Sequence, residues 1–230
     1  MRFHIISLFP ESFDSYLNSS MLKRAQARGF LSIDVYNQRE QTTDTHKTAD
    51  DRPYGGGPGM VLKAEPILET FESIQSKIKR QKLKIQLKNK KLKIKGKGLK
   101  ILILSPRGKT LTNEYAHTLV KKYSDLVFIA GHYEGIDARV KKILKAEELS
   151  IGPYVLTGGE LPAMVVIDCM ARQIPGVLGK NESLEEGRLA SSEVYTRPEI
   201  ITCKKKNYRV PKVLLSGNHK EIEAWKKSKK

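Results

Sequence analysis

The amino-acid sequence predicts an α/β domain with a mostly parallel β-sheet, followed by a small helical C-terminal lobe. Three observations lead to this fold class. Short apolar runs alternate with amphipathic helical patterns over most of the chain. Glycine-rich loops separate several of these elements. The 230 residues suffice for one sizeable core, and no run reaches the roughly 18 apolar residues of a membrane span.

Apolar runs predict four strands, at residues 3–8, 31–36, 101–104 and 126–130. Helical patterns with recognisable end signals lie between and after them. Gly29 ends one pattern, Pro66 occupies the first turn of another, and Thr112 precedes a third. The helices are expected at residues 19–28, 65–78, 113–123, 136–145 and 160–172.

Three segments depart from this alternation and define the domain organisation. Residues 37–60 form a long polar and glycine-rich loop, and loops of this length are usually functional or mobile. In a basic insertion at about 77–100, Lys alternates with Leu or Ile over residues 82–95. This alternation predicts a projecting β-hairpin, and an extended solvated arm is the alternative. A polar linker at 179–194 then separates a main domain, 1–178, from a small helical lobe, 195–230.

The charge distribution favours a polyanionic partner. The net charge is +17, and each phosphate that such a surface neutralises releases counterions. Twelve of the Lys and Arg residues lie between positions 77 and 100, without an acid among them. A merely solvated basic surface is the alternative. Cys169 and Cys203 lack the spacing of a metal or redox site, which favours free thiols in a cytoplasmic protein. No association with membranes is expected.

Two glycine-rich loops are the strongest candidates for a ligand site. GHYEGID at residues 131–137 follows an apolar run, and SIGPYVLTGGELP occupies residues 150–162. Glycine permits positive φ and lets a ligand approach the backbone closely. The sequence contains neither a P-loop nor a dinucleotide-binding fingerprint. We therefore expect a small molecule held by backbone amides and apolar side chains, with simple tight turns as the alternative.

Five long motifs, in the same order, resemble those of the bacterial tRNA (guanine-N1)-methyltransferases, a family of the SPOUT class. They are HKTADDRPYGGGPGM at 46–60, LSP at 104–106, the two glycine loops, IPGVLG at 174–179 and YTRPE at 195–199. The resemblance covers nearly all of residues 1–225 apart from the basic insertion. It implies a C-terminal trefoil knot, a homodimer with the site at the subunit interface, and methyl transfer from S-adenosyl-L-methionine to N1 of guanine 37 in the tRNA anticodon loop.

The resemblance also assigns the cofactor contacts, which would hold the two ends of S-adenosyl-L-methionine mainly through the backbone. They map onto Leu104, Ser105, Pro106, Gly131, Tyr133, Glu134, Gly135, Ser150, Ile151, Gly152, Pro153, Tyr154, Val155, Leu156, Gly158, Gly159 and Pro162. Glu134 matches an acid that is expected to touch the cofactor's amino group or a magnesium ion. In isolation, a Glu in a glycine loop is usually only exposed.

Methylation at guanine N1 requires a base for the N1 proton and a donor that stabilises negative charge on O6. By resemblance, Arg172 is the donor, although a lone Arg at a helix end is more often a solvated charge. The family's base is an Asp in the linker, and residues 179–195 contain no Asp. We expect Glu186, or failing that Glu185, to replace it. The alternative is that both are solvated charges and that activity is weak or lost.

The resemblance assigns RNA contacts to the polar loop. A flipped-out guanine and its neighbours would meet Asp50, Arg52, Tyr54, Gly55, Gly56, Gly57, Pro58 and Gly59. A flexible surface loop is the alternative. His46 has no second metal ligand at useful spacing, so no metal site is expected from it.

Two rival functions remain. One is a non-catalytic RNA-binding homologue that keeps the cofactor site, and the other is a related knotted methyltransferase acting on ribosomal RNA. The 55–59 loop and the YTRPE block argue against the second. The C-terminal lobe is shorter than is usual in the family, and we infer that residues 77–100 and the terminal lysines supply some of the phosphate contacts.

Overall fold

A computed structural model describes residues 1–88, 98–178 and 193–229. The chain divides into two compact units, Met1–Val177 and Leu178–Lys230, which are described separately below. The predicted linker, with Glu185 and Glu186, lies almost entirely outside the described residues.

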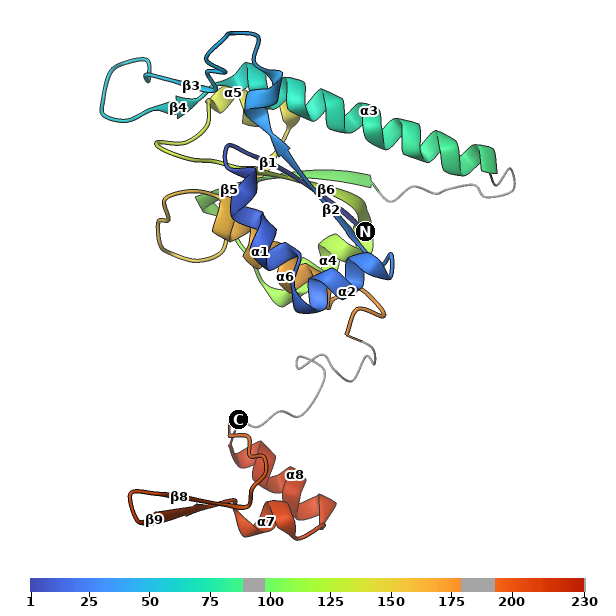
Figure 1. Cartoon of the computed structure of the whole chain (residues 1–230), viewed down its shortest axis with the longest axis vertical. Helices are drawn as coiled ribbons and strands as arrows, with labels where there is room; N and C mark the ends of the chain where they lie inside the picture. Colours follow the sequence, from blue (N-terminus) through green and yellow to red (C-terminus); the bar gives the residue numbers. More distant parts are fainter. Residues whose placement is uncertain (89–97, 179–192, 230) are drawn as a thin grey trace. The chain divides into compact units, whose positions relative to one another are not determined.

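The first unit is built on a five-stranded parallel sheet in the order β2-β1-β6-β5-β7 (Figure 1). Parallel pairing joins every neighbouring pair of strands. The strands are β1 (Arg2–Ser7), β2 (Ser32–Asn37), β5 (Gly98–Thr110), β6 (Tyr123–Ala130) and β7 (Glu147–Ser150). The four predicted strands are confirmed. β7 was not predicted, because its sequence EELS is short and mostly polar.

Helices cover both faces of the sheet (Figure 1). One face carries η1 (Pro10–Phe13), α1 (Asp14–Leu17), α2 (Ser20–Ala27), α4 (Asn113–Lys122) and α6 (Glu160–Arg172). The other carries α3 (Ala64–Lys88) and α5 (Ala138–Leu144). A sheet with helices on both faces is the architecture that the alternating sequence pattern predicts.

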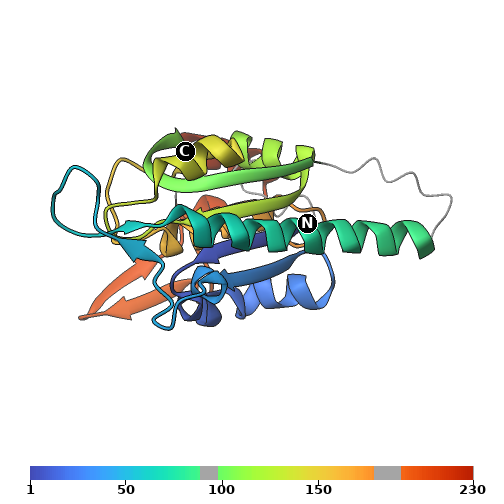
Figure 2. The same ribbon diagram turned by 90° about the horizontal axis from the view of Figure 1, so that it is seen from above.

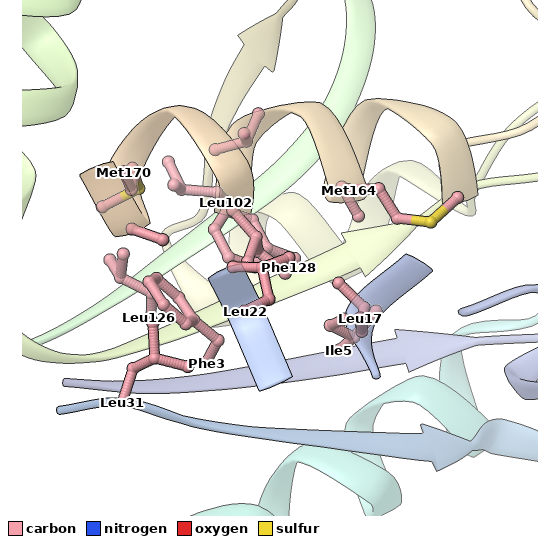
Figure 3. Close-up of a cluster of buried hydrophobic side chains, with 14 of the residues drawn as sticks. Phe3, Ile5, Leu17, Leu22, Leu31, Leu102, Leu126, Phe128, Met164 and Met170 are labelled. Atoms are coloured by element: carbon pink, nitrogen blue, oxygen red, sulfur yellow. The ribbon is translucent and has the colours of Figure 1, made fainter. Parts of the chain in front are cut away.

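The alternation of side chains along the strands produces the two cores. In β1, Phe3 and Ile5 join the cluster under α6, and Ile6 joins the cluster under α3. Figure 3 shows the first cluster, with Phe128 and Leu102 lying between the sheet and α6. The helix start at α4 is confirmed as well, because the Thr112 hydroxyl accepts a hydrogen bond from the amide of Tyr115 at 3.1 Å.

The β-hairpin expected over residues 82–95 is wrong for residues 82–88, which continue helix α3. Lys, Gln and Leu are good helix formers, and the buried Ile74 and Ile78 keep the helical spacing. Lys77 and Lys82 then pair with carboxylates of the sheet. These contacts require helical geometry, and they outweigh the local alternation of Lys and Leu. Residues 89–97 lie outside the described residues.

The long loop after β2 contains more local structure than expected. It begins with η2 (Gln38–Gln41), and β3 (Asp50–Asp51) pairs antiparallel with β4 (Val61–Leu62). The segment between β3 and β4 is therefore a loop whose two ends are held together by strand pairing.

The second unit contains a β-hairpin, which was not predicted, in addition to helices. Strands β8 (Ile200–Cys203) and β9 (Lys206–Arg209) pair antiparallel, followed by α7 (Lys212–Leu215) and α8 (His219–Ser228). The turn between the strands is Lys204-Lys205, with both residues at positive φ. Such turns usually carry Asn-Gly or Asp-Gly, so the sequence offers no hairpin signal here.

Candidate active site

Three loops gather at the carboxyl ends of three neighbouring strands. One is the 105–108 segment, where β5 interrupts its pairing with β7, and the other two follow β6 and β7; the strands lie side by side in the order β6-β5-β7. The last regular pairs place Leu104 beside both Ala130 and Leu149. In open α/β sheets, ligands bind in the crevice beyond the carboxyl ends of the strands. The predicted cofactor residues fall in these loops and in the first turn of the helix that follows them.

Backbone hydrogen bonds join the two glycine loops. The amide of Gly159 donates to the carbonyl of Gly131 at 2.7 Å, and His132 pairs antiparallel with Gly158. A Cβ on Gly159 would lie 2.7 Å from Cα of Ala130 and 2.9 Å from the amide nitrogen of Gly131. Only glycine permits this approach, so the sequence motif is explained by close packing of the backbone.

Backbone pairing with β7 flanks the loop at residues 105–108 on both sides. Leu149 pairs with both Leu104 and Lys109, so residues 105–108 form an excursion between two segments that both pair with β7. The amide of Leu111 donates to the carbonyl of Ser150 at 2.8 Å. The Ser150 hydroxyl in turn donates to the carbonyl of Gly152 at 2.9 Å and so shapes the start of the second glycine loop.

Large apolar side chains on these loops face solvent. Val155 is 81% exposed, and Tyr133, Tyr154 and Leu156 are also exposed. Folding does not bury these groups, and exposed apolar patches in a polar setting often mark ligand or partner sites. Together with the backbone groups, they can supply the apolar walls and amide contacts predicted from the sequence.

A buried polar group supports the start of α6, and the sequence reasoning missed it. The Ser7 hydroxyl donates to Glu160 Oε1 at 2.9 Å, and Glu160 Oε2 lies 3.5 Å from Nδ1 of His132. Glu160 is buried in the first turn of α6, where the positive end of the helix dipole favours a carboxylate. The group links β1, the first glycine loop and α6. A Glu directly after Gly-Gly at a helix start was the available signal.

The structure brings the predicted RNA-binding loop against the first glycine loop. The amide of Leu62 donates to the carbonyl of Gly135 at 2.9 Å, and the amide of Glu134 donates to the carbonyl of Met60 at 3.0 Å. A Cβ on Gly59 would lie 2.6 Å from the Glu134 side chain. Beyond this junction, Tyr54 is fully exposed at the end of the loop. Figure 2 shows the 52–60 loop projecting from the end of the sheet where the glycine loops lie.

Asp50 and Arg52 lie at the base of this projecting loop. Asp50 is in β3, and a guanidinium nitrogen of Arg39 approaches its carboxylate at 3.5 Å. Arg52 is exposed directly after the strand. The pairing of β3 with β4 therefore places both residues beside the glycine loops.

Arg172 is not brought to the glycine loops of its own chain. It is the last residue of α6, and the loops meet at Gly159, before the first residue of that helix. Thirteen helical residues separate the two ends by about 20 Å. The outer face of α6 also carries Leu161 and Val165, which are both exposed. They share the helical face of Arg172, because the positions 161, 165 and 172 recur at near-helical spacing.

Comparison with known proteins identifies the family of this chain. The model of the family described as tRNA (Guanine-1)-methyltransferase TrmD matches residues 1–230. The chain belongs to this family. A tRNA (guanine-N(1)-)-methyltransferase of Carboxydothermus hydrogenoformans is 46% identical over 99% of this chain and 81% of its own length. The protein of the same name from Clostridioides difficile is 40% identical over 99% of this chain and 91% of its own length.

Glu185 and Glu186, the expected bases, lie outside the described residues. Within the described part of the chain, no three His, Cys, Asp or Glu residues come together as a metal site. Among the same residues, no helix is long and apolar enough to span a membrane.

Proposed function

We propose that this protein transfers a methyl group from S-adenosyl-L-methionine to N1 of guanine 37 in the anticodon loop of tRNA, in the cytoplasm. The observation that carries the proposal is the junction between the glycine loops and the 52–60 loop. Backbone bonds at Glu134, Gly135 and Leu62 join them, so a ligand on one loop and a base on the other would be neighbours. Family membership supplies the reaction type.

The residues present suit the cofactor. Gly131, Gly158 and Gly159 let the two loops pack closely against each other, and Tyr133, Tyr154, Val155 and Leu156 present exposed apolar surface around them. When bound, S-adenosyl-L-methionine supplies a sulfonium methyl group that is open to in-line attack by a nitrogen. The protein's part is to hold the cofactor and guanine N1 in line, and positioning of this kind can supply much of the rate.

The protein must also move one proton and stabilise one charge. Guanine N1 carries a proton, and its removal puts negative charge on O6. We assign the base to Glu186, with Glu185 as the alternative, because these adjacent carboxylates lie in the linker where the family carries its Asp, and this linker contains no Asp. We assign the O6 donor to Arg172, whose guanidinium would stabilise the developing charge.

A homodimer would reconcile the position of Arg172 with this role. Within one chain, Arg172 lies about 20 Å along α6 from the loops. The face of α6 that carries Arg172 also exposes Leu161 and Val165, and Tyr16 of α1 is exposed nearby. Burial, together with the proximity of Asp168 of α6, raises the pKa of that tyrosine. A second copy that covered this face would bury the apolar side chains and bring Arg172 of the partner subunit to the loops.

The SPOUT-type trefoil knot is part of the same proposal. It is supported by the double pairing of Leu149 with Leu104 and Lys109, and by the bond from Leu111 to Ser150. Through these contacts, chain segments before and after residues 105–108 both lie against β7. The chain that leaves β7 toward the second glycine loop is therefore enclosed on two sides.

A magnesium ion, if the reaction uses one, would bind at Glu134. Magnesium usually keeps several waters and takes one or two carboxylates, so a single Glu beside the cofactor loops suits it better than a closed protein cage. Removal of divalent ions with a chelator, followed by addition of magnesium, tests this part of the proposal.

On the RNA side, Tyr54 would stack on a base of the unpaired anticodon loop. Its ring is fully exposed, and aromatic stacking is the usual way that proteins hold unpaired RNA bases. Backbone amides of residues 55–59 would then contact the flipped guanine.

Labelled methyl transfer to tRNA tests the proposed base. The wild type is compared with Glu185→Gln, Glu186→Gln, the double variant and Arg172→Ala. We expect the Glu186→Gln and Arg172→Ala variants to lose at least a hundredfold in kcat, the lower end of the usual contribution of general acid–base catalysis. Full activity in the double glutamine variant would refute the assignment of the base. Tight cofactor binding without any transfer would support the alternative of a non-catalytic RNA-binding homologue, for which the absence of an Asp from the linker is the motivating observation.

A further inference from the structure

The second half of α3 has a different charge from the first. The first half contains the three acids of the helix, Glu65, Glu69 and Glu72. From residue 73 to the end of the helix there is no acid, and the basic residues are Lys77, Lys79, Arg80, Lys82, Lys84 and Lys88. A solvated helix of ordinary composition mixes both signs, because opposite charges four residues apart stabilise it. The absence of acids here therefore costs helix stability.

Two of these cations point toward the sheet and anchor the helix. Lys77 Nζ lies 3.0 Å from Asp34 Oδ1 and donates to the Tyr36 hydroxyl at 3.2 Å. Lys82 Nζ lies 3.8 Å from Asp125 Oδ2, and Asp125 is fully buried. These contacts explain why Lys77 and Lys82 are basic, and they fix the rotation of the helix about its own axis.

The other cations of the described side chains point away from the sheet. Lys79, Arg80 and Lys84 are exposed, and their positions spread over about 140° of the helix surface, on the side away from the buried Ile74 and Ile78. Among the side chains that the structure describes, no carboxylate forms an ion pair with any of the three. Anchoring does not require these charges, and they repel one another. A partner that carries negative charge would account for them.

The location of this face indicates which part of an RNA it would meet. Helix α3 begins at Ala64, close to the bond between Leu62 and Gly135. Lys79 to Lys84 follow about 22 to 30 Å further along the helix. Figure 2 shows this end of α3 reaching past the strands, away from the 52–60 loop. These cations cannot reach a base that is held at the glycine loops. They can reach a duplex that continues from this base, since one turn of a nucleic-acid duplex is roughly 34 Å long.

We propose that the face formed by Lys79, Arg80 and Lys84 binds the phosphate backbone of tRNA outside the anticodon loop. The inference rests on the proposed function for the identity of the RNA, and it adds a second point of contact. Phosphate contacts of this kind position a nucleic acid without reading its sequence. The face would therefore increase affinity for whole tRNA while leaving the choice of the methylated base to the loops.

The test compares charge reversal on α3 with a matched reversal elsewhere. The first variant is Lys79→Glu/Arg80→Glu/Lys84→Glu. The control is Lys23→Glu/Arg24→Glu/Arg28→Glu, three exposed cations on α2 and at its C-cap, which lie on the opposite face of the sheet. Equilibrium Kd values are measured over a series of salt concentrations for two RNAs, an unmodified full-length tRNA and its isolated anticodon stem-loop. Binding of S-adenosyl-L-methionine and thermal unfolding serve as checks of folding.

We expect the α3 variant to bind full-length tRNA about tenfold more weakly at 0.1 M salt, and to reduce the slope of log K against log salt by about 2 to 3. The stem-loop Kd and cofactor binding should not change, and the α2 control should resemble the wild type. An unchanged Kd and salt slope for full-length tRNA would overturn the inference. So would equal losses for both RNAs or in both variants. Because binding is measured without turnover, failure of the proposed methyl transfer would appear separately, as no product on either RNA.

Discussion

The two ends of the central sheet are stabilised in different ways. At the carboxyl end, backbone approaches backbone through Gly159 and Gly131, and large apolar side chains remain exposed. At the amino end, charged side chains form hydrogen bonds and ion pairs. Arg2 forms two hydrogen bonds with the buried Asp125, which Lys82 and Ser124 also approach. Ion pairing therefore stabilises the amino end of the sheet. The carboxyl end keeps exposed apolar surface that can contact a ligand.

The largest effect on stability is expected at the amino end, from Asp125→Asn. The change leaves Arg2 without its carboxylate in a largely buried setting, which should reduce the free energy of unfolding by about 3 kcal/mol. Denaturant unfolding measures it, and cofactor affinity should stay within twofold. A stable variant that no longer binds the cofactor would contradict the division between the two ends.

The same residue makes stability depend on pH. Burial alone would raise the pKa of Asp125, but polar contacts from His4, Arg2 and Ser124 outweigh it and hold the pKa well below the ordinary 3.8. A carboxyl with a depressed folded-state pKa stabilises the fold fully above its ordinary pKa and loses that contribution as the pH falls toward the folded value. The wild type should therefore lose stability below about pH 4 more steeply than Asp125→Asn. Parallel curves for the two proteins would exclude this role.

At the carboxyl end, Gly159→Ala should affect binding more than Asp125→Asn does. Its Cβ would collide with backbone atoms of Ala130 and Gly131, and forced overpacking costs about 1 to 3 kcal/mol. Moving these loops apart should weaken S-adenosyl-L-methionine binding at least tenfold, measured by calorimetric titration. Wild-type affinity in this variant would show that the junction of the two loops is not part of the cofactor site.

Glu160 offers a matched pair of changes at the same end. Glu160→Ala removes the acceptor for the buried Ser7 hydroxyl and should cost about 1 to 3 kcal/mol, with a higher KM for the cofactor. Glu160→Gln keeps an oxygen for Ser7 and should recover most of both losses. If Gln is as damaging as Ala, the charge of Glu160 beside His132 matters more than its hydrogen bond.

The smallest effect on stability is expected for Gly56→Ala in the projecting loop. Gly56 has a φ of 79°, but nothing lies within 4 Å of the position of an added Cβ. An Ala at this positive φ is strained even in open space, so the free energy of unfolding should fall by about 1 kcal/mol. Binding of the anticodon stem-loop should weaken while cofactor binding is kept. A loss of cofactor binding would show that the two loops are more tightly coupled than their hydrogen bonds indicate.

The sequence predicted the carboxyl end of the sheet better than its periphery. Helix α6 and the glycine loops were predicted because glycine, proline and apolar spacing mark them directly. Strand β7 was not predicted because pairing with β5, and not its own composition, makes it a strand. Residues 82–88 were assigned to a hairpin because Asp125, which pairs with Lys82, lies far away in the sequence. The link from Ser7 to Glu160 is hidden for the same reason, since 153 positions separate them.

The most direct test of the central claim is to identify the methylated nucleoside. An unmodified tRNA transcript with guanine at position 37 is incubated with the protein and S-adenosyl-L-methionine, alongside the same transcript with adenine there. Digestion and mass spectrometry should find about one 1-methylguanosine per tRNA in the first and none in the second. No methylated product, or equal methylation of both transcripts, would contradict the proposed function.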